Sequence, residues 1–340
     1  MKNQLIFISL VFFTINSIAQ NITNIYKRVN PSVVTILTES ESIEANFETT
    51  KESSLGSGVL ISKEGEILTA AHVVNNAEKI TVKFTTGEEI PAKVIRSISI
   101  ADIALIKLSW MPEDYTVAKI GNSDNTNIGE KIMIIGAPYG LGNSLSVGYI
   151  SGKHTNQKRT SGFALNEYFQ TDASINHGNS GGPMFNLKGE VIGISSYIIS
   201  ESGGFQGLGF VVTSNLAKKL VIDSHTKWTG INGYLIDKVT AWVLNVPFNG
   251  GMLVESVVQF SPADFAGVKG GFQKVNLNGK NVILGGDIIL AVNDIPLTQE
   301  VFEQISGTKK DNNNFLEKDR YTLKILRGGN IEEVIINFKK

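Results

Sequence analysis

A chain of 340 residues is long for a single hydrophobic core and natural for two domains, and its 42% hydrophobic and 19% charged residues are those of an ordinary folded protein. A formal net charge of −1 provides no electrostatic attraction for nucleic acid or an anionic membrane, so we expect neither as a partner. The chain has no cysteine, which excludes disulfides, thiol catalysis and cysteine-ligated zinc.

Residues 1–19 have the layout of a secretory signal. Lys2 supplies a positive start, residues 5–13 are apolar, and small residues lead up to Ala19. The alternative is an uncleaved membrane anchor, but the apolar run is shorter than the roughly 20 residues that span a bilayer. No later segment is long and apolar enough to span. We therefore predict cleavage after Ala19 and an exported mature chain, periplasmic or extracellular.

Short apolar stretches separated by glycine-containing turns predict a mainly β fold. The first half should contain strands over 32–37, 56–62, 66–71, 80–84, 90–95 and 102–108. The second half should contain strands over 131–136, 144–151, 167–170, 191–195 and 207–212. The segment 39–54 is polar and lacks periodicity, which predicts a surface loop. Many short strands at regular spacing indicate two β-barrels, one in each half.

A helical pattern follows the second set of strands. Residues 214–224 are predicted to form a helix with Ser214 as its N-cap, and this helix ends a first domain over 20–225. Residues 226–230 are the predicted linker, and a second domain follows over 231–340.

The predicted first domain contains three residues of types that are suited to acyl transfer. Ser180 lies in the glycine-rich segment 178–183, His72 ends an apolar strand, and Asp102 begins another. Read singly, they are a turn, a core histidine and a capping aspartate. A serine nucleophile, however, needs a base and needs backbone N–H donors turned toward the oxyanion that it creates. Histidine, aspartate and serine in this order therefore indicate a nucleophile with its base and its orienting acid.

The motifs at 69–74, 102–105 and 171–183 resemble those of the trypsin-like serine proteases, and more closely those of the HtrA (Deg) family. The resemblance runs from about residue 29 to near the C-terminus. It implies a chymotrypsin-like double β-barrel, with the active site in the cleft between the barrels, and a serine endopeptidase.

The resemblance also implies a role for each of these residues. Ser180 Oγ would attack the scissile carbonyl, and His72 would take its proton and deliver it to the leaving amine. Asp102 would hold the imidazole in the right tautomer. The backbone N–H groups of Gly178 and Ser180 would form the oxyanion hole.

A primary specificity pocket is implied in the same way. Its predicted lining residues carry no charge, and they are Ser174, Ile175, Ile194, Ser195 and Ser196. An uncharged pocket of this kind predicts cleavage after small aliphatic residues such as Val, Ala or Ile.

The C-terminal part resembles the PDZ domain that follows the protease in HtrA proteins. Residues 261–268 predict a proline-initiated short helix, and residues 285–294 a turn, a strand and another turn. The PDZ carboxylate-binding loop aligns with Gly233, Tyr234, Leu235 and Ile236. Their backbone N–H groups would hold the C-terminus of a peptide that adds as a strand. The segment 271–284 is longer than a minimal PDZ domain needs.

The sequence also leads to expectations about oligomeric state, metals and cofactors. The family resemblance implies a homotrimer or higher homo-oligomer, with residues around Ile25 and Tyr26 involved. The four histidines show no paired ligand spacing, and neither an EF-hand loop nor a glycine-rich phosphate loop occurs. We therefore expect no metal and no cofactor.

The predicted function is cleavage of unfolded or damaged exported proteins. One alternative is a PDZ-gated regulatory protease with a single signalling substrate, which would show narrow instead of broad cleavage. A second alternative is a peptide-binding holdase whose triad is idle, and the complete set of His72, Asp102 and Ser180 argues against it.

Overall fold

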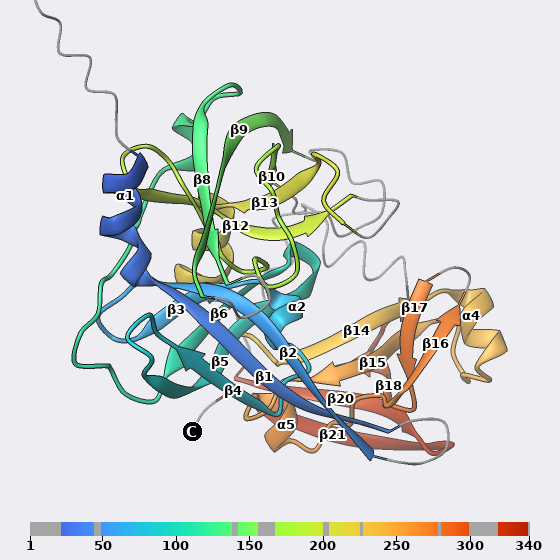
Figure 1. The fold of residues 1–340 in the computed structure, drawn as a ribbon. Helices are drawn as coiled ribbons and strands as arrows, with labels where there is room; N and C mark the ends of the chain where they lie inside the picture. The colour runs from blue at the N-terminus through green and yellow to red at the C-terminus, as the bar shows by residue number, and fades with distance from the viewer. Residues whose placement is uncertain are drawn as a thin grey trace, which may run out of the picture.

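The computed structural model describes residues 22–43, 49–137, 142–155, 167–199, 204–224, 227–277, 280–298 and 319–338. Figure 1 shows two barrels that follow each other along the chain and a third unit at their side. The predicted signal at 1–19 lies outside the described residues. None of the helices in the described ranges combines the length and the apolar character that crossing a membrane needs.

The first barrel closes in the order β1-β2-β3-β6-β5-β4. Its strands are β1 (Val33–Ile43), β2 (Thr49–Leu60), β3 (Glu66–Thr69), β4 (Lys79–Lys83), β5 (Glu89–Ile98) and β6 (Ile103–Leu108). The expected loop over 39–54 is wrong in its described part, because β1 and β2 remain paired as far as Ile43 opposite Thr49. Backbone pairing holds this end of the hairpin. Side chains such as Ser53 are exposed there, so no apolar alternation marks the strands.

The second barrel is closed by the pairing of β11 with β12, in the order β11-β8-β9-β10-β13-β12, and β7 pairs with β12 at its edge. Its strands are β7 (Lys119–Ile120), β8 (Lys131–Gly136), β9 (Ser144–Thr155), β10 (Glu167–Thr171), β11 (Pro183–Phe185), β12 (Glu190–Ile198) and β13 (Gly209–Thr213). The predicted double β-barrel is thus confirmed.

A hydrophobic core joins the two barrels. It includes Val33 and Leu68 from the first barrel, Met133 and Ile194 from the second, and Ile25 from the N-terminal helix α1 (Ile22–Val29), all at most 5% exposed. Separate clusters fill the interior of each barrel. Because interiors of this kind are close-packed, the shared core fixes the positions of residues that the two barrels contribute to one site.

A helical segment follows β13, as the pattern over 214–224 predicts. It begins as α3 (Ser214–Ala217) and continues as a π-helical turn over Lys218–Ile222. The prediction of Ser214 as N-cap is wrong, because Thr213 occupies that position. The Ser214 hydroxyl instead donates a hydrogen bond of 2.8 Å to the carbonyl of Gly121, so a tertiary contact takes the serine that local capping would use.

The third unit, which we call the C-terminal domain, comprises the described residues between 231 and 337. Its main sheet has the order β14-β15-β18-β20-β21, with β19 paired to β18. The strands are β14 (Ile231–Ile236), β15 (Gly251–Val257), β18 (Ile288–Val292), β19 (Ile295–Pro296), β20 (Arg320–Arg327) and β21 (Asn330–Asn337). Two short helices are α4 (Lys238–Val243) and α5 (Pro262–Phe265), and α5 confirms the predicted proline-initiated helix, with Ser261 as its N-cap.

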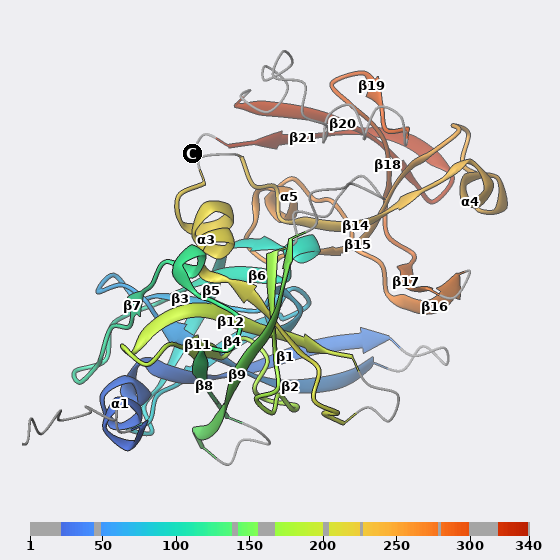
Figure 2. The same ribbon diagram turned by 90° about the horizontal axis from the view of Figure 1, so that it is seen from above.

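The long segment 271–284 contains a hairpin of its own. β16 (Gln273–Leu277) pairs with β17 (Lys280–Leu284) to form a separate two-stranded sheet, visible from above in Figure 2. Within the domain, the carboxylate of Asp287 is 1% exposed and accepts hydrogen bonds of 2.8 and 2.7 Å from Nε and Nη2 of Arg327. Such a buried charge is tolerated because it is paired.

Polar contacts join the C-terminal domain to the first barrel. The indole N–H of Trp228, in the segment just before β14, donates a hydrogen bond of 2.9 Å to the carbonyl of Ser97, and Ser99 donates to Asn232 on β14. Lys274 on β16 lies 3.6 Å from the Glu52 carboxylate on β2. The C-terminal domain is therefore held against the end of the first barrel that carries Ser97 and Ser99.

Candidate active site

His72 and Asp102 meet at one end of the first barrel. His72 lies in the short helix α2 (Ala71–Val74), which begins two residues after β3, and Asp102 stands directly before β6. The imidazole Nδ1 is 2.9 Å from each carboxylate oxygen of Asp102, and the backbone N–H of His72 donates to the same carboxylate at 3.0 Å. With Nδ1–H donating to a carboxylate, Nε2 is left to accept a proton.

The backbone of Asp102 adopts a left-handed conformation, with φ of 50°. This region is uncommon for residues other than glycine, although aspartate and asparagine enter it more readily than most. The residue follows the 3₁₀ turn η2 (Ser99–Ala101), and its side chain is fixed by His72, which contacts both oxygens, and by Ser196, which donates to Oδ2. The surrounding hydrogen bonds thus hold a strained residue at the point where the carboxylate meets the imidazole.

Ser180 lies in the turn that precedes β11, and its side chain is half-buried. The turn needs glycine at two positions with positive φ, Gly178 (96°) and Gly181 (81°). A Cβ atom on Gly181 would collide with Thr69 Oγ1 and with the carbonyl of Ser57. Gly181 is therefore required by the close approach of the first barrel as well as by its backbone conformation.

The first barrel contributes a residue that the sequence analysis missed. Ser57 on β2 donates from its backbone N–H to the carbonyl of Ser180 at 2.8 Å, and from its hydroxyl to the carbonyl of Gly178 at 2.6 Å. Ser57 is fully buried. The available signal was the pair of glycines Gly56 and Gly58 inside a predicted strand, since glycine within a strand marks the close approach of another backbone.

The predicted oxyanion hole consists of two backbone N–H groups of this turn. Within the described part of the chain, neither the N–H of Gly178 nor that of Ser180 donates a hydrogen bond. The turn is held instead through the carbonyl groups of these two residues, which point to Ser57. An oxyanion hole needs donors that are fixed in place and unengaged before the reaction, and the assignment of Gly178 and Ser180 to that role stays a prediction.

The described hydrogen bonds do not include one between Ser180 and His72. Nucleophile and base come from different barrels, and in structures without substrate such a hydrogen bond is often long or poorly aligned. The structure thus brings His72 and Asp102 into direct contact, and it places the Ser180 turn against the strand β2 of the barrel that carries them.

Of the residues of the predicted specificity pocket, one is exposed at the surface and the others are buried. Ser174 is exposed, whereas Ile175 is 2% exposed and packs in the interior of the second barrel. Ile194 belongs to the core shared by the barrels. Ser195 exchanges backbone hydrogen bonds of 2.8 Å with Gly181 and Gly182, which ties β12 to the Ser180 turn.

Ser196 has a different place from the predicted one. It is 2% exposed, and its hydroxyl donates to Asp102 Oδ2, so its side chain contacts the carboxylate of the first barrel. We expect Ser196→Ala to lower kcat about tenfold with little change in KM, because Asp102 then loses one of the hydrogen bonds that orient it. Steady-state kinetics on a peptide substrate measure kcat and KM separately. Ser196→Thr keeps the hydroxyl and should restore kcat, and a fall in both variants would contradict this positioning role.

Two tyrosines lie beside the carboxylate. Burial raises the pKa of Tyr168 to about 12, with smaller contributions from Tyr197 and from the charge of Asp102. Burial and the Asp102 charge also raise the pKa of Tyr197, whose ring stacks on Phe210 at 4.8 Å between centroids. Both phenols are neutral at physiological pH, so they add no charge next to Asp102.

The predicted carboxylate-binding residues lie on one strand of the C-terminal domain. Gly233, Tyr234, Leu235 and Ile236 all belong to β14, which stands at one end of the strand order and pairs with β15. Ile236 is fully buried and Gly233 is exposed. The segment is therefore a strand at the edge of a sheet and lies next to Asn232, which contacts Ser99 of the first barrel.

Known proteins share both the sequence and the fold. The profile of the trypsin-like peptidase domain matches residues 56–194. The probable periplasmic serine endoprotease DegP-like of Pseudomonas fulva (strain 12-X) is 36% identical over 281 residues, which cover 81% of this chain and 56% of that protein. The protein of the same name from Buchnera aphidicola subsp. Baizongia pistaciae (strain Bp) is 32% identical over 354 residues, with 94% of this chain and 70% of that protein covered.

Most of these curated relatives are longer, and the chain spans about half of their length. Among solved structures, the HtrA-type protease AlgW with decapeptide has a TM-score of 0.52 and 26% identity, with 93% of this chain and 97% of that chain covered. The same protease with tripeptide has a TM-score of 0.51 and 28% identity, with coverage of 93% and 95%. The chain is therefore a member of the HtrA/DegP-like family of trypsin-like serine endoproteases.

Proposed function

We propose that the chain hydrolyses peptide bonds through a covalent acyl-enzyme. Ser180 Oγ attacks the scissile carbonyl carbon while its proton passes to His72 Nε2. The imidazolium then gives this proton to the leaving amine as the C–N bond breaks. Water, deprotonated by His72, releases the acyl group in the second half of the reaction and restores the serine.

Asp102 and the Ser180 turn stabilise the charges that form along this path. The carboxylate, 2.9 Å from Nδ1, stabilises the imidazolium and keeps Nε2 directed to the nucleophile. The N–H groups of Gly178 and Ser180 bind the oxyanion. The observation that carries the proposal is the pairing of His72 with a carboxylate that is itself fixed by Ser196 from the second barrel.

The substrates that we propose are unfolded or damaged exported proteins. The relatives are named periplasmic serine endoproteases, which supports export of this chain. The predicted pocket residues carry no charge, which favours a small aliphatic side chain before the scissile bond. An extended segment can pair with the backbone of the protease, and unfolded chains offer such segments where folded proteins do not.

For the C-terminal domain we propose a PDZ role, binding the C-terminal ends of peptides. β14 stands at the end of its sheet, and a peptide could extend the sheet by pairing there. The AlgW structures of similar fold were solved with a decapeptide and with a tripeptide. We also propose a homotrimer built through the region of α1, where Tyr26 donates a hydrogen bond of 3.0 Å to the carbonyl of Asn143.

The experiment that tests the function is digestion of unfolded casein by the chain from Gln20 onward, with the cut sites mapped by mass spectrometry. We expect cuts at many sites, with Val, Ala or Ile before most of them. Folded and unfolded forms of one test protein are compared in parallel. Cleavage at a single sequence would favour a regulatory protease, and lack of cleavage in the presence of C-terminal peptides would favour a peptide-binding holdase.

A further inference from the structure

A cavity of about 600 Å³ lies between the two domains, directly beside His72. The first barrel contributes His72, Asn75 and Ser99 to its walls, and the C-terminal domain contributes Asn232, Glu255 and Lys274. The His72 side chain is 51% exposed and is thus the point where the cavity meets the candidate active site.

The outer wall is the hairpin β16–β17, which lies in the segment that is longer than a minimal PDZ domain needs. Two contacts fix it in place. Lys274 lies 3.6 Å from the Glu52 carboxylate on β2, and the backbone N–H of Ile283 donates to Glu255 Oε1 at 3.2 Å. The hairpin is thus tied both to the first barrel and to the strand β15 beneath it, so the cavity has walls that are held by both domains.

Glu255 is the charged group of this cavity that lacks a counter-ion. It is half-buried, and within the described residues no lysine, arginine or histidine forms an ion pair with it. Burial raises the pKa of Glu255, and the hydrogen bond from Ile283 acts in the opposite direction. A cation stabilises a half-buried carboxylate that has a single backbone donor, because the attraction between the charges is stronger where water is partly excluded.

The lysine of the cavity wall, Lys274, pairs across the hairpin with Ile283, and its ammonium lies 3.6 Å from the Glu52 carboxylate. Apart from His72 and Glu255, the other polar side chains of the wall are neutral, and they are Asn75, Asn76, Ser99, Asn232, Ser256 and Asn276. Apolar walls come from Val275, Val282 and Ile283 of the hairpin. A long side chain with an aliphatic stem and a cationic end fits this combination of apolar walls and a carboxylate.

We propose that the inter-domain cavity is a substrate subsite, in which Glu255 binds the Lys or Arg side chain of a residue close to the scissile bond. The inference rests on the proposed roles of His72 and Ser180. Consecutive residues of an extended peptide are about 3.3–3.6 Å apart, so a residue within a few positions of the cut can place its side chain there. The C-terminal domain thereby takes part in substrate selection at the active site itself.

The test uses the full mature chain and fluorogenic peptides with Val before the cut. The three residues that precede this Val and the three that follow the cut are Ala, and each Ala is replaced in turn by Lys and by Asp. We expect one position at which Lys raises kcat/KM about tenfold over Ala. Glu255→Gln should abolish this preference, because it removes the charge and keeps the acceptor for Ile283. Glu255→Lys should shift the preference at that position from Lys to Asp.

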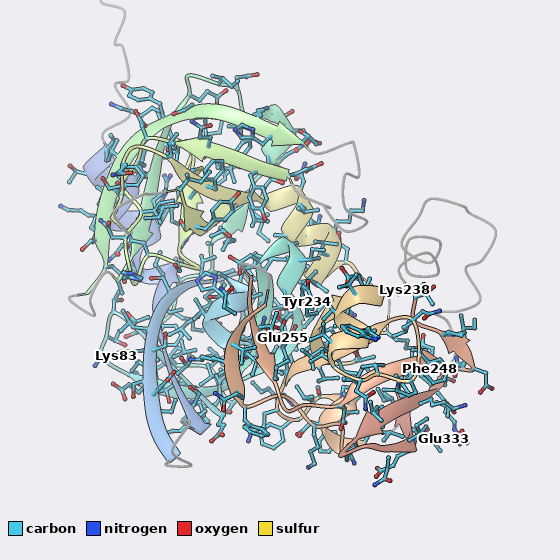
Figure 3. The ribbon with its side chains drawn as sticks, turned by 90° about the vertical axis from the view of Figure 1, so that its right-hand side faces the viewer. Lys83, Tyr234, Lys238, Phe248, Glu255 and Glu333 are labelled. Carbon is cyan, nitrogen blue, oxygen red and sulfur yellow. The ribbon has the colours of Figure 1, made fainter. Side chains whose placement is uncertain are left out.

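Glu333→Gln is the matched control. Glu333 is exposed on β21, and Figure 3 places it on the far side of the C-terminal domain from Glu255, which lies on the side facing the barrels. The Glu333→Gln protein should show the same kcat/KM values across the peptide set as the parent protein. The Ala peptides should be cleaved by all variants within about twofold of the parent rate.

The outcomes separate this inference from the proposed function. A parent protein that cleaves the Ala peptides without any preference for Lys overturns the subsite and leaves the catalytic proposal in place. A Lys preference that survives in Glu255→Gln also overturns it. A parent protein that cleaves none of the peptides overturns the proposed function and the subsite together.

Discussion

Ser180→Ala is expected to lower kcat for peptide hydrolysis about 10⁶-fold, because the acyl-enzyme then has no oxygen through which to form. The fold should persist, since the hydrogen bonds that hold this turn use the backbone carbonyls of Gly178 and Ser180. The measurement is hydrolysis of casein and of a Val peptide by parent and variant, together with thermal unfolding of both proteins.

Equal rates in parent and variant would contradict the role of Ser180 as nucleophile. A covalent label provides an independent reading. A fluorophosphonate should add one label to the parent chain at Ser180 and none to the variant, with intact mass as the measurement. Labelling of a serine elsewhere would assign the nucleophile to another residue.

Asp102→Asn should lower kcat about 10⁴-fold at neutral pH, because an amide does not stabilise the imidazolium and can favour the wrong tautomer of His72. Asparagine has the same shape as aspartate and also adopts the left-handed backbone conformation that this position requires, with φ of 50°. The loss should therefore come from chemistry, and the thermal stability should change little.

Asp114→Asn serves as the control for this change. Asp114 is exposed in the loop after β6 and takes no part in the hydrogen bonds of His72 and Asp102, so its substitution should leave kcat at the parent value. The measurement is kcat of the parent, of Asp102→Asn and of Asp114→Asn with the same peptide. A kcat of Asp102→Asn close to that of the parent would show that the contact between His72 and Asp102 does not serve catalysis.

The sequence was sufficient to predict the double barrel, because alternating apolar residues mark its strands. The contact of His72 with Asp102 was expected from the family resemblance and not from a local pattern, since it joins residues 30 positions apart, and His72, expected at the end of a strand, lies in the short helix α2. Ser57 could not be identified in the same way. Its role depends on a hydrogen bond to Gly178, 121 residues away, and only the flanking glycines hint at it.

The same reason explains the other differences. Ser214 resembles an N-cap in sequence, but the carbonyl of Gly121 takes its hydroxyl once the chain has folded. The length of the segment 271–284 is plain in the sequence, whereas its position beside His72 depends on how two domains pack. Contacts between distant segments are therefore what the residues alone do not determine.

The hydrogen bonds of Ser57 to the Ser180 turn also have a consequence for the order of events during maturation. The turn belongs to the second barrel and its support to the first, so neither barrel alone holds the turn in its final form. Contacts between segments this far apart form late, because a long loop must close first. Peptidase activity should thus appear only after the barrels have docked, so a chain that is still folding is not yet able to cut peptide bonds.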